Sequence, residues 1–251
     1  MKISVITVSY NSSATLVDTL QSVAAQTHPE VEHILIDGGS TDSTSDLVKQ
    51  FGRHLAKYVS EPDQGIYDAM NKGLALATGD IVGFINSDDL FFESDSLAKI
   101  ASAFSDADID AVYGDIVMVD PVKLQIIHRY WRPGMFRQGA FAHGWMVPHP
   151  TLYVRRETLM ATGGFNLSYR LQADFDLELR LFELMSVRSM YLPSTLVRMR
   201  MGGATTGSLR NILRGNIEAA NSVQSHGFSG GVRFIINKMI RRLPQYWIRP
   251  Q

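Results

Sequence analysis

The chain has 251 residues, 45% of them apolar and 20% charged, a composition typical of a globular protein with a sizeable core. Its 24 basic and 25 acidic residues give a net charge of −1, so no overall charge recruits nucleic acid. The sequence contains no cysteine, which excludes disulfides and thiolate metal sites and fits a reducing compartment.

The N-terminal residues enter a strand pattern directly, without a small-residue cleavage site. No apolar stretch of the sequence is long enough to cross a bilayer. We therefore expect a cytoplasmic protein without a signal peptide, one that is still able to lie on the inner face of a membrane.

Strand and helix patterns alternate in the N-terminal part of the chain. Apolar runs predict strands at 3–8, 31–36, 57–60 and 81–85, and apolar residues at helical spacing predict helices at 16–24, 43–51 and 66–77. Beyond them the sequence predicts a helix at 97–104, β segments at 111–115 and 125–131, a long loop at 133–147 and a strand at 149–154. The alternation predicts an α/β fold with a mainly parallel, doubly wound sheet and helices on both faces.

Polar residues follow three of the predicted parallel strands. Ser9 and Tyr10 follow the first, Asp37 the second, and Asp88 and Asp89 the fourth. Because the carboxyl ends of parallel strands share one edge of a sheet, these side chains are candidates to line one crevice, and a nucleotide is its natural occupant. The sequence has neither GxGxxG nor GxxxxGK[ST], which argues against a dinucleotide enzyme and a P-loop NTPase.

Asp88 and Asp89 are adjacent carboxylates that repel each other. A divalent cation relieves this repulsion and offers open positions to phosphate oxygens. The alternative is that Ser87 or an Asp caps a helix beginning near Leu90, just as Thr41 or Asp42 would simply cap the helix at 43–51. His149, at the start of a predicted strand, could join the metal or a phosphate, although a single histidine is more often structural.

Asp174 precedes a helix that we predict from Phe175 onward. The helix dipole favours a carboxylate at this position, so Asp174 is either a cap or a general base that faces an acceptor. In the C-terminal tail we expect a helix at 208–225. The segment 231–243 then contains four basic residues and no acidic ones. It predicts either an amphipathic helix in a membrane interface or a helix packed on the domain with solvated arginines outside.

Several motifs in order resemble those of family 2 inverting glycosyltransferases of the GT-A type, which build bacterial polysaccharides. The matching segments are 6–11, 37–42, 60–73, 86–89, 149–151, 163–165 and 173–177. The resemblance implies a GT-A catalytic domain at 1–205, with a nucleotide-binding half to about residue 110 and an acceptor half at 111–205. A helical, basic-amphipathic tail at 206–251 would follow.

The resemblance also implies a nucleotide-diphosphate sugar donor, UDP-sugar being favoured, a Mg²⁺ or Mn²⁺ ion, and a glycan or lipid-linked acceptor. The implied nucleoside contacts are Thr7, Ser9, Tyr10 and Asp37. Asp88 and Asp89 would serve the ribose and the metal, and Asp174 would deprotonate the acceptor hydroxyl.

The sequence departs from the family pattern at two positions. Asn86 stands where the metal motif usually begins with Asp, and Ala173 replaces the Glu that often precedes the base. Asp174 remains the preferred base over Asp176, because helical geometry turns Asp176 away.

Two other functions use the same residue types. A nucleotidyltransferase would need a basic or glycine-rich loop after the first strand, and residues 8–12 do not provide one. A non-catalytic nucleotide-sugar-binding scaffold would not need Asp174.

Overall fold

The computed structural model describes residues 1–202 and 208–247. The strands are β1 (Ile3–Ser9), β2 (Val31–Asp37), β3 (Leu55–Ser60), β4 (Ile81–Asn86), β5 (Leu90–Phe91), β6 (Ala111–Val119), β7 (Ile127–Trp131), β8 (Tyr153–Arg155) and β9 (Ser189–Arg200). The α-helices are α1 (Leu16–Ala24), α2 (Thr44–Phe51), α3 (Ile66–Leu76), α4 (Ser96–Ala103), α5 (Arg156–Ala161), α6 (Ala173–Leu179), α7 (Leu209–Ser225) and α8 (Val232–Ile240). Shorter helical segments are η1 (Phe141–His143), η2 (His149–Thr151), the π-helical η3 (Arg180–Leu184) and η4 (Leu243–Tyr246).

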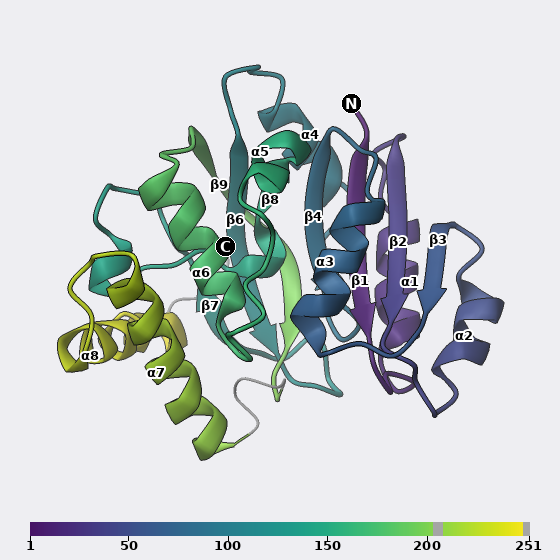
Figure 1. Ribbon diagram of the computed structural model, residues 1–251. Coiled ribbons are helices and arrows are strands. Elements are labelled where there is room, and N and C mark those ends of the chain that lie inside the picture. Colours follow the sequence, from purple (N-terminus) through teal and green to yellow (C-terminus); the bar gives the residue numbers. More distant parts are fainter. Residues whose placement is uncertain (203–207, 248–251) are drawn as a thin grey trace.

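The described strands form one sheet in the order β3-β2-β1-β4-β8-β6-β9-β5, with β7 beside β6 (Figure 1). The first four strands are parallel to one another. Strand β8 runs antiparallel to both β4 and β6, whereas β6 and β9 are parallel. Helices lie on both faces, so the predicted α/β architecture is confirmed.

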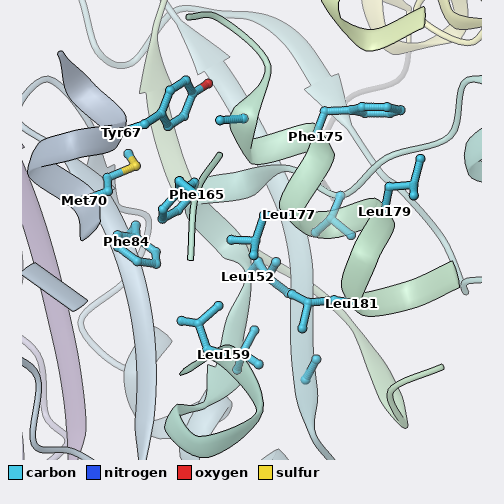
Figure 2. Packing of buried hydrophobic residues seen from close by; sticks show 14 of the residues in the cluster. Tyr67, Met70, Phe84, Leu152, Leu159, Phe165, Phe175, Leu177, Leu179 and Leu181 are labelled. Carbon is cyan, nitrogen blue, oxygen red and sulfur yellow. The ribbon is translucent and has the colours of Figure 1, made fainter. Parts of the chain in front are cut away.

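Alternating residues of β1 point into two separate cores. Ile6 packs on one face of the sheet with residues of α3 and α6. Val5 packs on the other face with residues of α1 and α4. Figure 2 shows the first core, where Phe165 packs between Tyr67 of α3 and Phe84 of β4. The polar residues that follow these strands are thereby brought to one edge of a fixed sheet.

Two predicted details differ from the structure. His149 does not begin a strand, because 149–151 forms the 3₁₀ turn η2 and β8 starts only at Tyr153. Strand β9 was not among the predicted elements. It contains Pro193, a residue type that argues against a central strand. The register accommodates this proline by a shift: Gly114 pairs with Leu192, but Asp115 pairs with Thr195.

The C-terminal tail packs against the sheet-containing part of the chain. The predicted boundary near residue 205 lies outside the described residues. Val223 of α7 and Phe234 of α8 are buried in the same core as Phe175 of α6, so the tail shares that core. None of the helices in the described part of the chain combines the length and apolar character needed to span a bilayer.

Gly144 permits a close approach between η1 and α8. Its φ is +76°, and a Cβ there would lie 2.5 Å from the backbone nitrogen of Lys238. We predict that Gly144→Ala destabilises the protein by about 2–4 kcal/mol and loosens the tail, because backbone strain and a steric clash add. Gly139→Ala is the control: its φ is +84°, but nothing lies within 4 Å of the added Cβ. Thermal unfolding and limited proteolysis check this, and equal effects of the two variants would contradict it.

Candidate functional site

A cavity of about 450 Å³ lies between the sheet, α6 and the C-terminal tail. Its wall includes Asn86 from the end of β4 and Asp174 from the first turn of α6. His149 and Tyr67 line it beside them, and Lys238 lines it from the tail. Residues far apart in the sequence therefore meet at this cavity.

The turn 86–89 at the end of β4 is held from several directions. The hydroxyl of Thr19 donates to the Asp89 carbonyl at 2.7 Å, and Arg200 Nη1 donates to the Asp88 carbonyl at 2.7 Å. Ser87 Oγ lies 2.8 Å from Ser12 Oγ. The prediction that this segment caps a helix near Leu90 is wrong, because Leu90 begins β5, which pairs with β9.

The Asp89 carboxyl group is buried and only partly satisfied. Its side chain is 1% exposed, its Oδ2 accepts a 3.3 Å hydrogen bond from Asn86 Nδ2, and its Oδ1 has no partner among the described residues. Asn86 Oδ1 is likewise buried without a described partner. Burial, followed by the charge of Asp88, raises the pKa of Asp89 well above its ordinary value. These uncompensated oxygens are the donor type that Mg²⁺ and Mn²⁺ prefer.

His149 does not join Asp88 and Asp89 in a common metal site. Within 1–202 and 208–247, no group of three or more His, Asp or Glu side chains is placed to hold a metal ion. The ring of His149 instead stacks on Phe84, with 5.5 Å between centroids, and its Nδ1 lies 3.8 Å from Glu178 Oε1. Burial lowers the pKa of His149, so the ring is neutral. His149 is therefore not grouped with these aspartates among the described residues, and its tentative assignment as a metal ligand stays a prediction.

Asp174 faces the cavity from the start of α6. Its Oδ1 accepts a 2.9 Å hydrogen bond from the hydroxyl of Tyr67, which is itself buried in α3. Burial, with the neighbouring Asp174 carboxylate adding to it, raises the pKa of Tyr67 well above its ordinary value, so the phenol keeps its proton and donates a hydrogen bond to the carboxylate. A hydrogen-bonded carboxylate at a cavity wall is positioned to accept a proton from a bound hydroxyl group.

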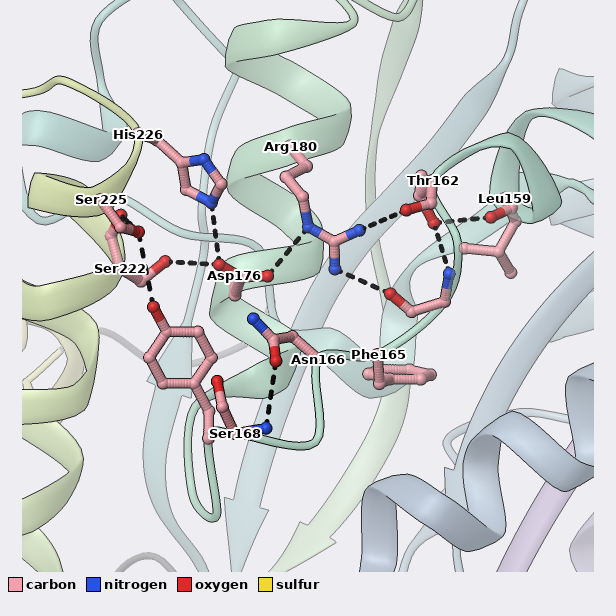
Figure 3. A network of polar contacts seen from close by, with 12 residues as sticks. Leu159, Thr162, Phe165, Asn166, Ser168, Asp176, Arg180, Ser222, Ser225 and His226 are labelled. Carbon is pink, nitrogen blue, oxygen red and sulfur yellow. Dashed lines mark hydrogen bonds and ion pairs between the residues drawn. The ribbon is translucent and has the colours of Figure 1, made fainter.

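Asp176 has a different environment, although it lies only two residues further along α6. Its carboxylate accepts hydrogen bonds from Arg180 Nε at 2.8 Å and from Ser222 Oγ at 2.9 Å (Figure 3). His226 Nε2 lies 2.9 Å from the same carboxylate. Asp176 therefore connects α6 to α7, in agreement with the expectation that it is turned away from the acceptor.

The side chains predicted to contact the nucleoside differ in their exposure and in their hydrogen-bond partners. Tyr10 is 64% exposed, and the buried hydroxyl of Ser9 has no partner among the described residues. Asp37 is fully buried, and its Oδ2 accepts hydrogen bonds from the Ser40 amide at 3.0 Å and from Ser60 Oγ at 2.7 Å. This pairing fixes the end of β2 at the same edge of the sheet.

Thr7 has its side chain turned into the sheet, and its role in nucleoside binding stays a prediction. Its side chain is fully buried, and Oγ1 lies 2.9 Å from His33 Nε2 on the neighbouring strand. Asp42 has a local structural role just before α2, which was the alternative to a role in binding. Its Oδ1 accepts a 3.0 Å hydrogen bond from the Thr44 amide at the start of that helix.

Sequence reasoning missed Tyr67, Arg200 and Lys238. Tyr67 lies within a matched motif, but only the fold shows that its hydroxyl reaches Asp174. Arg200 ends the unanticipated strand β9, so no local signal linked it to the turn after β4. Lys238 belongs to a segment whose basic residues were expected to face solvent or lipid.

Comparison with known proteins identifies relatives of this chain. A family model described as glycosyl transferase family 2 matches residues 4–162. A PGL/p-HBAD biosynthesis glycosyltransferase of Mycobacterium bovis is 34% identical over 193 residues, which cover 75% of this chain and 73% of that protein. An uncharacterised glycosyltransferase of Mycobacterium tuberculosis is 34% identical over 71% of this chain and 68% of its own length.

Solved structures share the fold. The mannosyltransferase PcManGT from Pyrobaculum calidifontis, solved with GDP-Man and Mn²⁺, matches with a TM-score of 0.69 and 21% identity, over 98% of this chain and 71% of its own. S. aureus TarS matches with a TM-score of 0.68 and 20% identity over 98% of this chain, but this chain spans only 44% of TarS. At these identities the two structures support the fold alone. With the family match over most of the sheet, they show that this chain is a glycosyltransferase of family 2 with the GT-A fold.

Proposed function

We propose that this enzyme transfers a sugar from a nucleotide-diphosphate sugar to a hydroxyl group of a glycan or lipid-linked acceptor in polysaccharide biosynthesis, with inversion at the anomeric carbon. A single observation carries the proposal: the Asp174 carboxylate and Asn86, at the start of the acidic turn, line the same cavity. A UDP-sugar is the favoured donor. In support, TarS has been solved with UDP-GlcNAc and PcManGT with GDP-Man.

The donor would bind along the carboxyl ends of β1, β2 and β4. Tyr10 is exposed for stacking on a base, and Ser9 and Asp37 lie at paired positions at the ends of β1 and β2. Oxygens of Asp89 and Asp88 would hold a Mg²⁺ or Mn²⁺ ion, which stabilises the negative charge that develops on the leaving diphosphate.

The acceptor hydroxyl would be deprotonated by Asp174 as it attacks the anomeric carbon. The hydrogen bond from Tyr67 fixes the carboxylate and leaves its other oxygen for the incoming hydroxyl. One in-line displacement inverts the anomeric centre, so the enzyme needs no nucleophile of its own.

Asp174→Asn should lower kcat by about 10²–10⁴ and leave donor binding intact, because only proton removal is lost. Sugar transfer and donor hydrolysis with a panel of sugar nucleotides and Mn²⁺ would measure this. Glu178→Gln is the matched control near the same cavity: burial raises the pKa of Glu178 well above its ordinary value, so an amide replaces a neutral group. Parent-like turnover by Asp174→Asn would remove the base assignment and favour a scaffold.

Asp89→Asn should weaken Mn²⁺-dependent binding of UDP by about tenfold or more, because a charge-assisted ligand is lost. In the parent protein the apparent affinity should increase with pH, since the raised pKa of Asp89 means that a proton leaves when a cation binds. Calorimetry in buffers of different ionisation enthalpy detects that proton. Asp46→Asn is the control, because the Asp46 side chain is 79% exposed on α2. A metal affinity that falls with pH would contradict the assignment.

We further propose that the tail contacts the cytoplasmic face of a membrane. The outer surface of α8 is apolar: Ile236, Met239 and Ile240 are 49–57% exposed. Trp247 after η4 is 75% exposed. Residues 228–247 include no acidic side chain, and two of their four basic residues, Arg233 and Arg241, are exposed, which suits anionic lipid headgroups.

The double substitution Met239→Asn and Ile240→Asn should reduce sedimentation with anionic liposomes by about tenfold, because two exposed apolar side chains no longer enter the interface. Val122→Asn, at a residue 85% exposed in the turn between β6 and β7, controls for general loss of surface hydrophobicity. Unchanged sedimentation of the double variant would refute membrane contact through α8.

A further inference from the structure

Five cationic side chains line the cavity at the end formed by β7 and the tail. Arg132 lies 3.7 Å from Asp115, and Arg241 donates to the His143 carbonyl at 3.0 Å. The other three are Arg129 of β7, Lys238 of α8 and Arg242 just before η4. Arg129 is 8% exposed and Lys238 is 3% exposed. Among the described residues, no carboxylate lies within 4.0 Å of any of the three, although buried cations are normally paired.

Neutral groups hold these cations in place without compensating their charge. Arg129 Nε donates to Gln245 Oε1 at 2.5 Å, and its guanidinium lies 5.4 Å from the ring centroid of Trp131. Lys238 Nζ donates to Gln172 Oε1 at 2.8 Å and lies 5.1 Å from the ring centroid of Phe175. Arg129 and Lys238 are thus positioned by amide oxygens and aromatic rings, none of which carries a negative charge.

The pKa values of Lys238 and Arg129 are lowered because burial disfavours their charged forms. Burial, with a smaller repulsion from Arg242, lowers the pKa of Lys238 to about 7 and that of Arg129 to about 10. The acidic groups that act on Lys238 are Asp174 and Glu178, and both raise its pKa. Burial raises the pKa of Glu178 well above its ordinary value, which disfavours its charged form, and Asp174 accepts the hydrogen bond from Tyr67. An anion in the cavity would relieve the uncompensated charge.

We propose that this end of the cavity binds a phosphate group of the acceptor, which places the acceptor's hydroxyl group beside Asp174. Three cations favour a ligand with more than one negative charge over a carboxylate, and arginine matches phosphate geometry. The cations come from β7 and the tail, whereas the donor edge is formed by β1, β2 and β4, so the phosphate belongs to the acceptor. This inference rests on the proposed function and narrows its acceptor to phosphorylated alcohols.

The test is calorimetric titration of the full chain with phenyl phosphate, with and without saturating UDP and Mn²⁺. We expect binding in both conditions, and a loss of affinity of about tenfold or more in Arg129→Gln and in Arg242→Gln. Arg242 is partly exposed, so its variant keeps the test valid if Arg129→Gln fails to fold. Arg233→Gln is the matched control, because Arg233 lies at an exposed position of α8.

Competition between phenyl phosphate and UDP would assign the cations to the donor diphosphate and overturn the proposal, and so would the absence of binding to the parent chain. Octyl phosphate distinguishes a lipid-linked acceptor phosphate from a soluble one. Tighter binding of octyl phosphate than of phenyl phosphate supports a lipid phosphate, and equal binding of the two supports a soluble phosphate. A chain that binds phenyl phosphate beside UDP but transfers no sugar would leave the anion site standing and remove the proposed function.

Discussion

The buried carboxyl group of Asp89 at the end of β4 is the constraint on which the arrangement of the site depends. Burying a carboxylate without full hydrogen bonding is unfavourable, so its position must be imposed by its surroundings. Thr19 and Arg200 impose it by binding the backbone of the turn, not the carboxylate oxygens. The fold therefore fixes where this carboxyl group lies, and in the proposed function a bound cation neutralises it. Helix α1 and strand β9 therefore hold the backbone of this turn in place, although neither belongs to the turn.

Helix α6 assigns two neighbouring aspartates to different tasks. Asp174 is at the cavity wall with a single phenol donor, while Asp176 is enclosed by Arg180, Ser222 and His226. The second network anchors α7, and so the tail, on the helix that carries the proposed base. The orientation of the base and the docking of the tail accordingly depend on one element. Their separation on the helix follows from the 100° rotation between successive residues, roughly 200° over two positions.

The N-terminal half was predictable because its signals are local. Each of the first four strands is a short apolar run that ends in turn residues, and parallel pairing brings those ends together, which located Asp37, Asp88 and Asp89. The features that the sequence did not indicate are non-local. The hydroxyl of Thr7 lies within hydrogen-bond distance of His33 on the neighbouring strand, a contact that no local pattern predicts. Strand β9 exists because β6 offers it a partner, which outweighs the presence of a proline in its sequence.

The tail shows why composition alone could not decide between packing and membrane contact. A helix that packs on a domain usually has one apolar face and one polar face. In α8 the inner face contains Phe234 and the buried Lys238, and the outer face contains Ile236 and Ile240. The helix packs on the domain, as one of the two expectations had it, and it exposes the apolar Ile236 and Ile240 beside Arg233, while membrane contact stays a prediction. With Lys238 turned inward and Ile236 and Ile240 turned outward, the tail suits a ligand whose charged group enters the cavity while its apolar part stays outside.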